Sequence, residues 1–493
     1  MDVLIPLAVV LPLLGAAVDL LLVRSLVAQR VVSVATVAAT CGIAVAILVG
    51  VESDGTHAVQ IGGWDAPIGI TLVADLMAAL FLLVSVLTVL FVLVFAVGQR
   101  ADERAIFHPA YLVLTAGVGG SFLAGDLFNL FVCFEMMLIA SYVLITLGAT
   151  KEQVRSGMTY VVINLTASTL FVTGVAFVYA ATGTLNMADL AERFPALPDG
   201  LRLGIGLVFL VVFGVKAALF PLFGWLPDSY PTAPTSVTAV FSGLLTKVGV
   251  YAIIRTQMVF DLPELGGLLL VVSALTMTVG VVGAIAQDDV KRILSFHIIS
   301  QIGYMIMGLG LYTIAGLAGA VFYVVHHIPV KTVLFLVSGL VEHVGGTSAL
   351  ARVSGLLHRK PVVAALFLPP ALSLAGIPPF SGFVAKLALV DSGLRAEQWT
   401  VVAVSLVVSI LTLVSMTKIW SGVFWGDGAE DLPAGTALAA HERSMPLMVG
   451  ATAAAVLLTL FIAGSAGALY DLAERASTGL HDLDEYIAAV RGG

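Results

Sequence analysis

Residues 126–142 read DLFNLFVCFEMMLIASY, an apolar run with one glutamate, Glu135, in its interior. The helix that it predicts continues to about residue 147 and is long enough to cross a bilayer core of about 30 Å. Similar runs recur along the 493 residues, which are 59% hydrophobic and only 11% charged, against about 25% charged in soluble proteins. The sequence therefore predicts an all-α polytopic membrane protein. A carboxylate deep inside a span is costly and marks a candidate functional residue.

About fourteen transmembrane spans are expected. They fall near 3–23, 31–50, 72–98, 108–125, 126–148, 157–182, 203–224, 232–254, 264–286, 292–311, 314–341, 362–393, 399–424 and 445–464. The first is read as a membrane helix and not as a cleaved signal, because Asp2 stands where a signal peptide carries positive charge. Four further segments are predicted between and after the spans: a hairpin at 51–71, a short amphipathic helix capped by Asn186 within 184–200, a charged loop at 425–444, and an amphipathic tail at 465–493.

The basic residues divide unevenly between the two sides of the membrane. Loops after odd-numbered spans and the adjoining span ends hold thirteen lysines and arginines, including Lys291 and Arg443, whereas the other side holds six, including Arg255. The positive-inside rule places the richer side in the cytoplasm. We therefore expect a multi-pass protein of the cell membrane with both termini outside.

Four basic residues are left over, and all are lysines within predicted spans: Lys216, Lys247, Lys331 and Lys386. These lysines could handle protons, or they could be passive members of buried ion pairs or long side chains that reach the membrane interface. Arginine stays protonated in proteins, whereas a buried lysine can release its proton near neutral pH. The expected absence of buried arginine therefore favours proton-handling lysines. Glu135 suits the same chemistry, since a nearby carboxylate helps lysine hold its proton and separation of the pair would release it.

Helix breakers surround two of these lysines. Lys216 precedes FPLFGWLPDSYPTAP, which begins at residue 220, and Lys386 ends AGIPPFSGFVAK. Broken helices in corresponding places of two halves indicate an inverted-repeat transporter. We expect two inverted five-helix repeats, each with one broken helix. The proposed units are 1–107 (helices 1–3 with an outward hairpin), 108–255 (helices 4–8), 264–425 (helices 9–13) and 426–493 (the last helix and tail).

Histidines lie between the lysines of the two halves. His327 and Lys331 share a helix face at i and i+4, with His326 beside them. His297 begins a polar stripe with Gln301 and Tyr304. A lone buried histidine is more often a satisfied core residue, but three in adjacent spans favour a proton relay, for which a pKa of about 6.5 is suited. Asp126 is either a helix N-cap or a functional group, and no role is preferred for Asp19 and Asp75.

Several stretches resemble the antiporter-like chains shared by the Mrp multisubunit Na⁺/H⁺ antiporters, the membrane arm of respiratory complex I and the membrane-bound hydrogenases. They are GDLFNLFVCFEMMLIASYVLI, GWLPDSYPTAPTSVTAVFSGLLTKVGVYAIIR, DDVKRILSFHIISQIGYMIMGLG, VKTVLFLVSG and LSLAGIPPFSGFVAKLALV. The resemblance runs from about residue 70 to 425. Within the superfamily the chain looks most like the D-type branch of the Mrp antiporters, which MTKIWSGVFWG supports. Lys386 excludes one class of complex I relative that carries glutamate there. Ser229 and Tyr230 replace an Ala-His pair of respiratory relatives, so no role of that histidine is carried over.

The resemblance implies a proton path from Glu135 and Lys216 through Lys247, the histidines and Lys331 to Lys386. It also implies partner membrane subunits of the Mrp A, B, C, E, F and G types, with protons and Na⁺ as the transported ions. No cofactor, resident metal, nucleic acid or chemical reaction is expected. Cys41 and Cys133 fall in apolar spans and are expected to be inert.

The alternative is a non-redox, proton-pumping subunit of a respiratory complex I or of a membrane-bound hydrogenase. The sequence carries no dinucleotide fingerprint and no cysteine cluster for iron–sulfur ligation, so the redox chemistry would belong to partner subunits. A third alternative is a purely structural subunit, in which the buried lysines would have no functional role.

Overall fold

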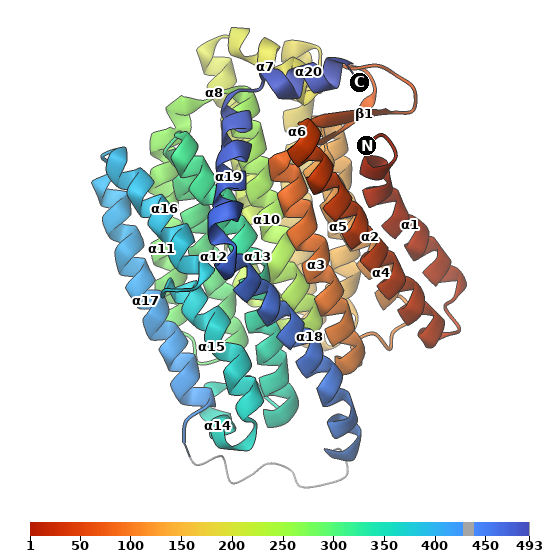
Figure 1. Ribbon diagram of the computed structural model, residues 1–493, viewed down its shortest axis with the longest axis vertical. Helices are drawn as coiled ribbons and strands as arrows, with labels where there is room; N and C mark the ends of the chain where they lie inside the picture. The colour runs from red at the N-terminus through yellow and green to blue at the C-terminus, as the bar shows by residue number, and fades with distance from the viewer. Residues whose placement is uncertain (427–437, 493) are drawn as a thin grey trace.

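The computed structural model describes residues 1–426 and 438–492, with side chains from residue 445 onward in the second range. Most of the predicted charged loop at 425–444, and the side chain of Arg443, lie outside the described residues. Within them, 12 helices are long and apolar enough to cross a membrane, and they stand side by side in Figure 1. These are α1 (Leu4–Leu21), α2 (Leu26–Asp54), α3 (Leu76–Gln99), α5 (Leu127–Thr146), α6 (Lys151–Thr182), α8 (Asp199–Ala217), α10 (Thr235–Phe260), α11 (Gly266–Ile285), α12 (Val290–Gly310), α13 (Ile314–Gly345), α17 (Trp399–Val423) and α18 (Leu438–Gly464).

Two of the fourteen expected spans correspond to shorter helices. One holds α4 (Phe107–Leu123), and the other holds the pair α15 (Pro361–Ala375) and α16 (Ser381–Arg395). The polytopic helical fold is therefore confirmed, while the count of fourteen stays a prediction. Helix ends differ from the expected bounds by several residues; α10, for example, continues to Phe260 rather than ending near residue 254.

Both expected breaks are present. Helix α8 ends at Ala217, and its C-cap Ala218 adopts a left-handed conformation with φ of 60° before the chain reaches the short helix α9 (Trp225–Ser229). Helix α15 ends at Ala375, followed by Gly376 with φ of 85°. A proline cannot donate its nitrogen to the helical ladder, so Pro221 and the Pro378–Pro379 pair prevent continuation after each break.

Small elements cover the side of the bundle where both labelled termini lie (Figure 1). The expected hairpin is confirmed as strands β1 (His57–Ile61) and β2 (Ile70–Ala74), paired antiparallel with His57 opposite Ala74. The expected amphipathic helix is α7 (Met187–Arg193), capped by the side chain of Asn186. The other short elements of the chain are η1 (Phe194–Ala196), η2 (Tyr230–Thr232), η3 (Pro263–Leu265), η4 (Leu350–Arg352) and α14 (Leu356–Arg359). Helix α14 lies at the opposite end of the bundle (Figure 1).

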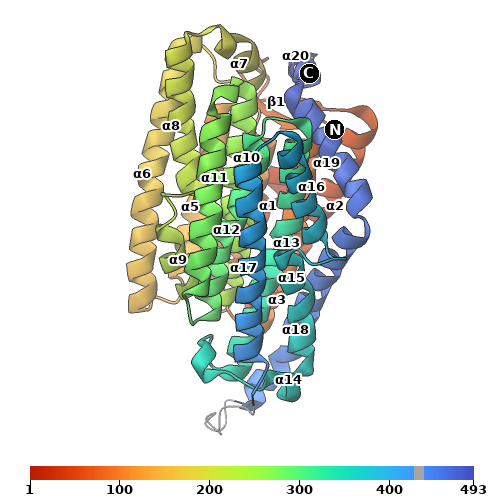
Figure 2. The same ribbon diagram turned by 90° about the vertical axis from the view of Figure 1, so that its left-hand side faces the viewer.

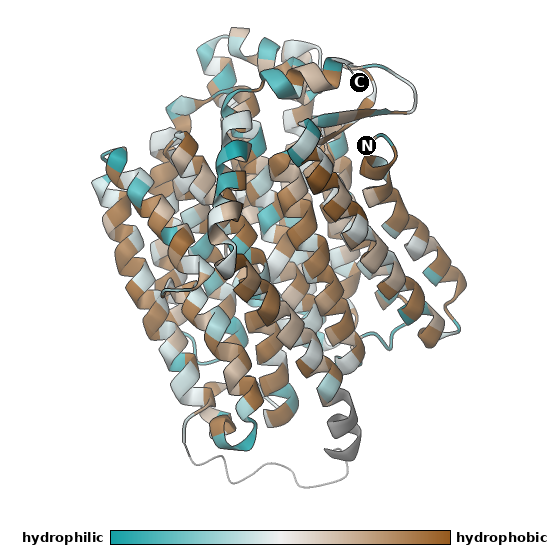
Figure 3. Cartoon of the chain, in the orientation of Figure 1, coloured by the Kyte–Doolittle hydropathy of each residue, from teal (hydrophilic) through white to brown (hydrophobic). Residues whose placement is uncertain are grey.

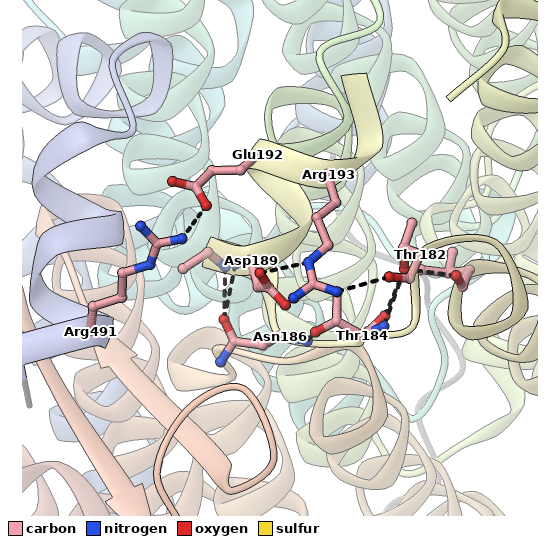
Figure 4. Close-up of polar contacts among 9 residues, drawn as sticks. Thr182, Thr184, Asn186, Asp189, Glu192, Arg193 and Arg491 are labelled. Carbon is pink, nitrogen blue, oxygen red and sulfur yellow. Dashed lines mark hydrogen bonds and ion pairs between the residues drawn. The ribbon is translucent and has the colours of Figure 1, made fainter. Parts of the chain in front are cut away.

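The predicted amphipathic tail forms α19 (Ala466–His481) and α20 (Asp484–Gly492), which pack on this chain itself. Arg491 of α20 forms an ion pair with Glu192 of α7, beside the bond from Arg193 to Asp189 (Figure 4). Glu485 accepts a hydrogen bond from the Thr56 backbone nitrogen at 2.6 Å. These contacts fasten α20 across α7 and the hairpin.

Helices α10, α12 and α13 form the centre of the bundle and are buried over nearly their whole length. Figure 2 shows α6 and α8 at one edge of the molecule and α19 at the opposite one. Apolar residues dominate the long helices, and hydrophilic ones gather mainly at the two ends of the bundle (Figure 3). The polar side chains of these central helices are therefore buried within the protein and must serve packing or function.

Candidate functional site

The four lysines that the sequence analysis placed within predicted spans are buried on four different helices. Lys216 lies in the last turn of α8, Lys247 in α10, Lys331 in α13 and Lys386 in α16. Their exposed fractions are 4%, 0%, 0% and 7% in that order. Burial of a charged ammonium is costly unless a counter-charge lies close.

The expectation that no arginine is buried is wrong. Arg255 is 2% exposed because α10 extends beyond the predicted span end, and Lys291 is buried as well. Each has a direct carboxylate partner: Arg255 Nη2 lies 2.5 Å from an Asp75 oxygen, and Lys291 Nζ lies 2.7 Å from Glu342. Among the ion pairs of the described residues, none includes any of the four lysines. The distinction is therefore between paired and unpaired cations, not between arginine and lysine.

Lys216 and Glu135 are linked through a third residue that the sequence alone does not identify. Lys216 Nζ donates to Ser168 Oγ at 3.0 Å and to the Asn164 carbonyl oxygen at 3.2 Å. The Ser168 hydroxyl in turn donates to Glu135 Oε1. Glu135 itself is half-buried on α5. The expected direct pair is thus a three-membered chain, lysine to serine to glutamate.

Lys247 and Lys331 face the centre from α10 and α13. Lys247 Nζ donates to the Ser242 carbonyl oxygen and, at 3.3 Å, to Thr246 Oγ1. Lys331 Nζ has no hydrogen-bond partner among the described residues and lies 5.8 Å from the centre of the Phe335 ring. Buried polar groups without protein partners are rare and call for water or a functional explanation.

The histidines lie between these lysines, on α12 and α13. His297 Nε2 contacts Ser415 Oγ of α17, and His326 Nδ1 lies 2.9 Å from Ser381 Oγ, at the start of α16. Their other ring nitrogens, and both nitrogens of His327, have no partner in the part of the chain that the structure describes. His327 lies one helical turn before Lys331 on α13. The centre thus holds a row of buried exchangeable groups.

Lys386 sits at the second helix break. Its Nζ donates to the carbonyl oxygens of Leu374 and Ala375 at 3.0 and 3.1 Å, and to Ser409 Oγ at 3.0 Å. The two carbonyls belong to the end of α15, where the helix dipole favours a cation. The ammonium also lies 5.0 Å from the centre of the Tyr304 ring. The helix break therefore supplies two of the hydrogen-bond acceptors of the lysine.

The three aspartates without a preferred role have structural partners. Asp126 accepts from the Asn129 nitrogen at 2.7 Å, so it is the N-cap of α5, and it also accepts from the Thr71 nitrogen. Asp75 caps α3 in addition to pairing with its arginine. Asp19 accepts from the Ser33 hydroxyl at 2.6 Å.

No group of three or more His, Cys, Asp or Glu side chains in the described ranges could hold a metal ion. Cys41 and Cys133 are both buried and free.

The comparisons with known proteins bear on the family and the fold. Residues 124–412 match the family described as NADH:quinone oxidoreductase/Mrp antiporter, transmembrane. The chain is 47% identical to the D-type Na⁺/H⁺ antiporter subunit of Alkalihalophilus pseudofirmus over 87% of this chain and 88% of that one. Its fold matches a chain of the Mrp complex from Dietzia sp. with a TM-score of 0.92, at 35% identity over the full length of both chains. A chain of respiratory complex I from Thermus thermophilus matches with a TM-score of 0.83, at 26% identity over 97% of this chain and 99% of that one. The protein is a multi-pass membrane protein that belongs to the NADH:quinone oxidoreductase/Mrp antiporter family.

Proposed function

We propose that this chain is the proton-translocating subunit of a multisubunit Na⁺/H⁺ antiporter in the cell membrane, with both termini outside. The observation that carries the proposal is the set of four buried lysines without a direct carboxylate partner among the described residues, with three histidines between them. A permanent, unpaired charge at such a position is costly. A side chain that takes up and releases a proton bears that charge only for part of the cycle.

The proton path has two halves joined by the centre. Glu135, Lys216 and Lys247 form the first half, and Lys386 gates the second. Lys331, His297, His326 and His327 join them. Inward movement of protons through this path drives Na⁺ outward, and the partner subunits are of the Mrp A, B, C, E, F and G types. The subunit transports ions and carries out no covalent chemistry.

The two halves correspond to inverted repeats at 108–255 and 264–425, flanked by 1–107 and 426–493. Two features support this division. Each half contains one broken helix, α8 in the first and α15–α16 in the second. Each also contains an isolated β-bridge at the N-cap of its second helix, Asp126 with Asn186 and Asp289 with Ala349.

The test is Na⁺/H⁺ exchange in vesicles that contain the complete complex. Glu135→Gln, Lys216→Ala and Lys386→Gln should each lower the exchange rate about 10²-fold or more, the range for loss of a proton-transfer group. Arg395→Gln is the matched control, because Arg395 lies on the same helix as Lys386 but is exposed and pairs with Asp391. Normal exchange by the three variants in an assembled complex would refute the assignment.

The complex I match supports a second candidate, a proton-pumping subunit of a respiratory complex. Copurification distinguishes the two functions. Partners with flavin or iron–sulfur sites would favour the respiratory complex, and small membrane subunits alone would favour the antiporter.

A further inference from the structure

Ser168 occupies the position between the first two charged groups of the proton path. It lies on α6, a helix that contributes neither Lys216 nor Glu135, and it is 5% exposed. Its oxygen accepts a hydrogen bond from Lys216 Nζ at 3.0 Å, and its hydrogen is donated to Glu135 Oε1. We propose that the Ser168 hydroxyl is the relay through which Lys216 and Glu135 exchange a proton. This inference rests on the proposed function and assigns a residue to its first step.

The surroundings leave Ser168 as the connecting group. No ion pair of the described residues joins Glu135 to Lys216 directly. The other acceptor for Lys216 is the Asn164 carbonyl oxygen, which carries no exchangeable hydrogen. The Ser141 hydroxyl, on the same helix as Glu135, contacts the Leu138 carbonyl and the Tyr160 hydroxyl instead.

The relay step balances in atoms and charge. An N–H bond of the Lys216 ammonium breaks, and its proton moves to Ser168 Oγ while the original Ser168 proton moves to Glu135 Oε1. The products are a neutral amine, an unchanged serine hydroxyl and a neutral carboxylic acid. The reverse step restores the ammonium and the carboxylate.

The relay also gives the step a direction in space. Lys216 is buried, whereas Glu135 is half-buried on α5. A proton that passes from Lys216 through Ser168 therefore moves from the more enclosed group to the less enclosed one. Lys216 and Glu135 become neutral together without moving apart, so transfer requires no separation of the two side chains.

The decisive experiment compares Ser168→Thr with Ser168→Val in vesicles that contain the complete complex. The two side chains have nearly the same shape, but only threonine keeps the hydroxyl, and valine leaves no space for a substituting water. We expect Thr to retain most of the exchange rate and Val to lose about 10²-fold or more, with a changed pH profile in Val. Ser141→Ala is a control for loss of a buried hydroxyl on the same helix as Glu135 and should exchange normally.

Each outcome bears on the inference. Equal exchange by assembled Thr and Val variants, at the wild-type pH profile, would overturn it. If the added methyl group inactivates both, Ser168→Ala decides: a slower rate with a shifted pH profile supports the relay, and wild-type behaviour overturns it. Glu135→Gln and Lys216→Ala are assayed in parallel. If they are inactive while every Ser168 variant is normal, the relay fails and the proposed function stands; if they exchange normally, the proposed function itself fails.

Discussion

Asp75→Asn tests whether a paired buried cation is structural, in contrast to the unpaired lysines. Arg255 Nη2 lies 2.5 Å from Asp75 Oδ2, with side-chain exposures of 2% and 15%. Asparagine keeps the N-cap of α3, because its side-chain oxygen can still accept from the Ala78 nitrogen, now 2.8 Å from Asp75 Oδ1. The substitution therefore removes the charge and little else.

The expected magnitude follows from burial. Removing one partner of a buried ion pair leaves the other charge uncompensated and costs about 3–5 kcal/mol. The matched control is Asp391→Asn, since Asp391 pairs with Arg395 at 2.8 Å but the two side chains are 54% and 77% exposed. An exposed pair at i and i+4 contributes about 0.3–0.5 kcal/mol.

The assay is unfolding of the purified complex by SDS in mixed micelles, followed by tryptophan fluorescence. Asp75→Asn should lower the unfolding free energy by several times the effect of Asp391→Asn. The pH profile of exchange in complexes that stay folded should be unchanged. Equal, small effects of the two substitutions would refute the reasoning.

Three further predictions concern other sites. Lys331→Met should abolish exchange without lowering stability, because Nζ has no hydrogen-bond partner to lose among the described residues; vesicle exchange and SDS unfolding measure the two effects. Gly382→Ala should destabilise the break by about 1–3 kcal/mol or more, since a Cβ there would collide with the Ser373 carbonyl oxygen, and the yield of assembled complex reports the loss. Burial alone would raise the pKa of Asp102, but hydrogen bonds from His108 and from an arginine of α2 hold that pKa below its usual range. Its stabilising effect should therefore be complete above about pH 4 and disappear on further acidification, which a comparison with Asp102→Asn at a series of pH values would detect.

The fold was predictable where the sequence carries strong local signals. Apolar runs of membrane-spanning length predicted the bundle, and Pro221 and the Pro378–Pro379 pair predicted both breaks. The hairpin at 51–71 and the cap at Asn186 follow from turn and capping chemistry. Helix ends were less predictable, because polar residues at a span end are read as loop even where packing extends the helix. Arg255 was misplaced for this reason.

The individual ionisable residues of the candidate site could be identified from the sequence, but the hydrogen bonds that link them could not. Glu135 and the four lysines stood out because ionisable groups inside spans are rare. Ser168 did not, because a serine in an apolar helix is common and its hydroxyl usually bonds to its own backbone. One signal was available: Asn164 and Ser168 lie at i and i+4 in a long span, so two polar side chains share a face. Which charged groups that face meets depends on how α5, α6 and α8 pack, and no local pattern encodes it.

At the helix break beside Lys386, the charge of the lysine is linked to the position of the backbone. The same ammonium that would carry the proton also holds the last two carbonyl groups of α15, across the residues 376–380 that lead into α16. A charged donor holds such oxygens more strongly than a neutral amine does. Loss of the proton would therefore weaken the hydrogen bonds that hold the end of α15 to α16. Gain or loss of a single proton at Lys386 would then alter how the two half-helices are held relative to each other.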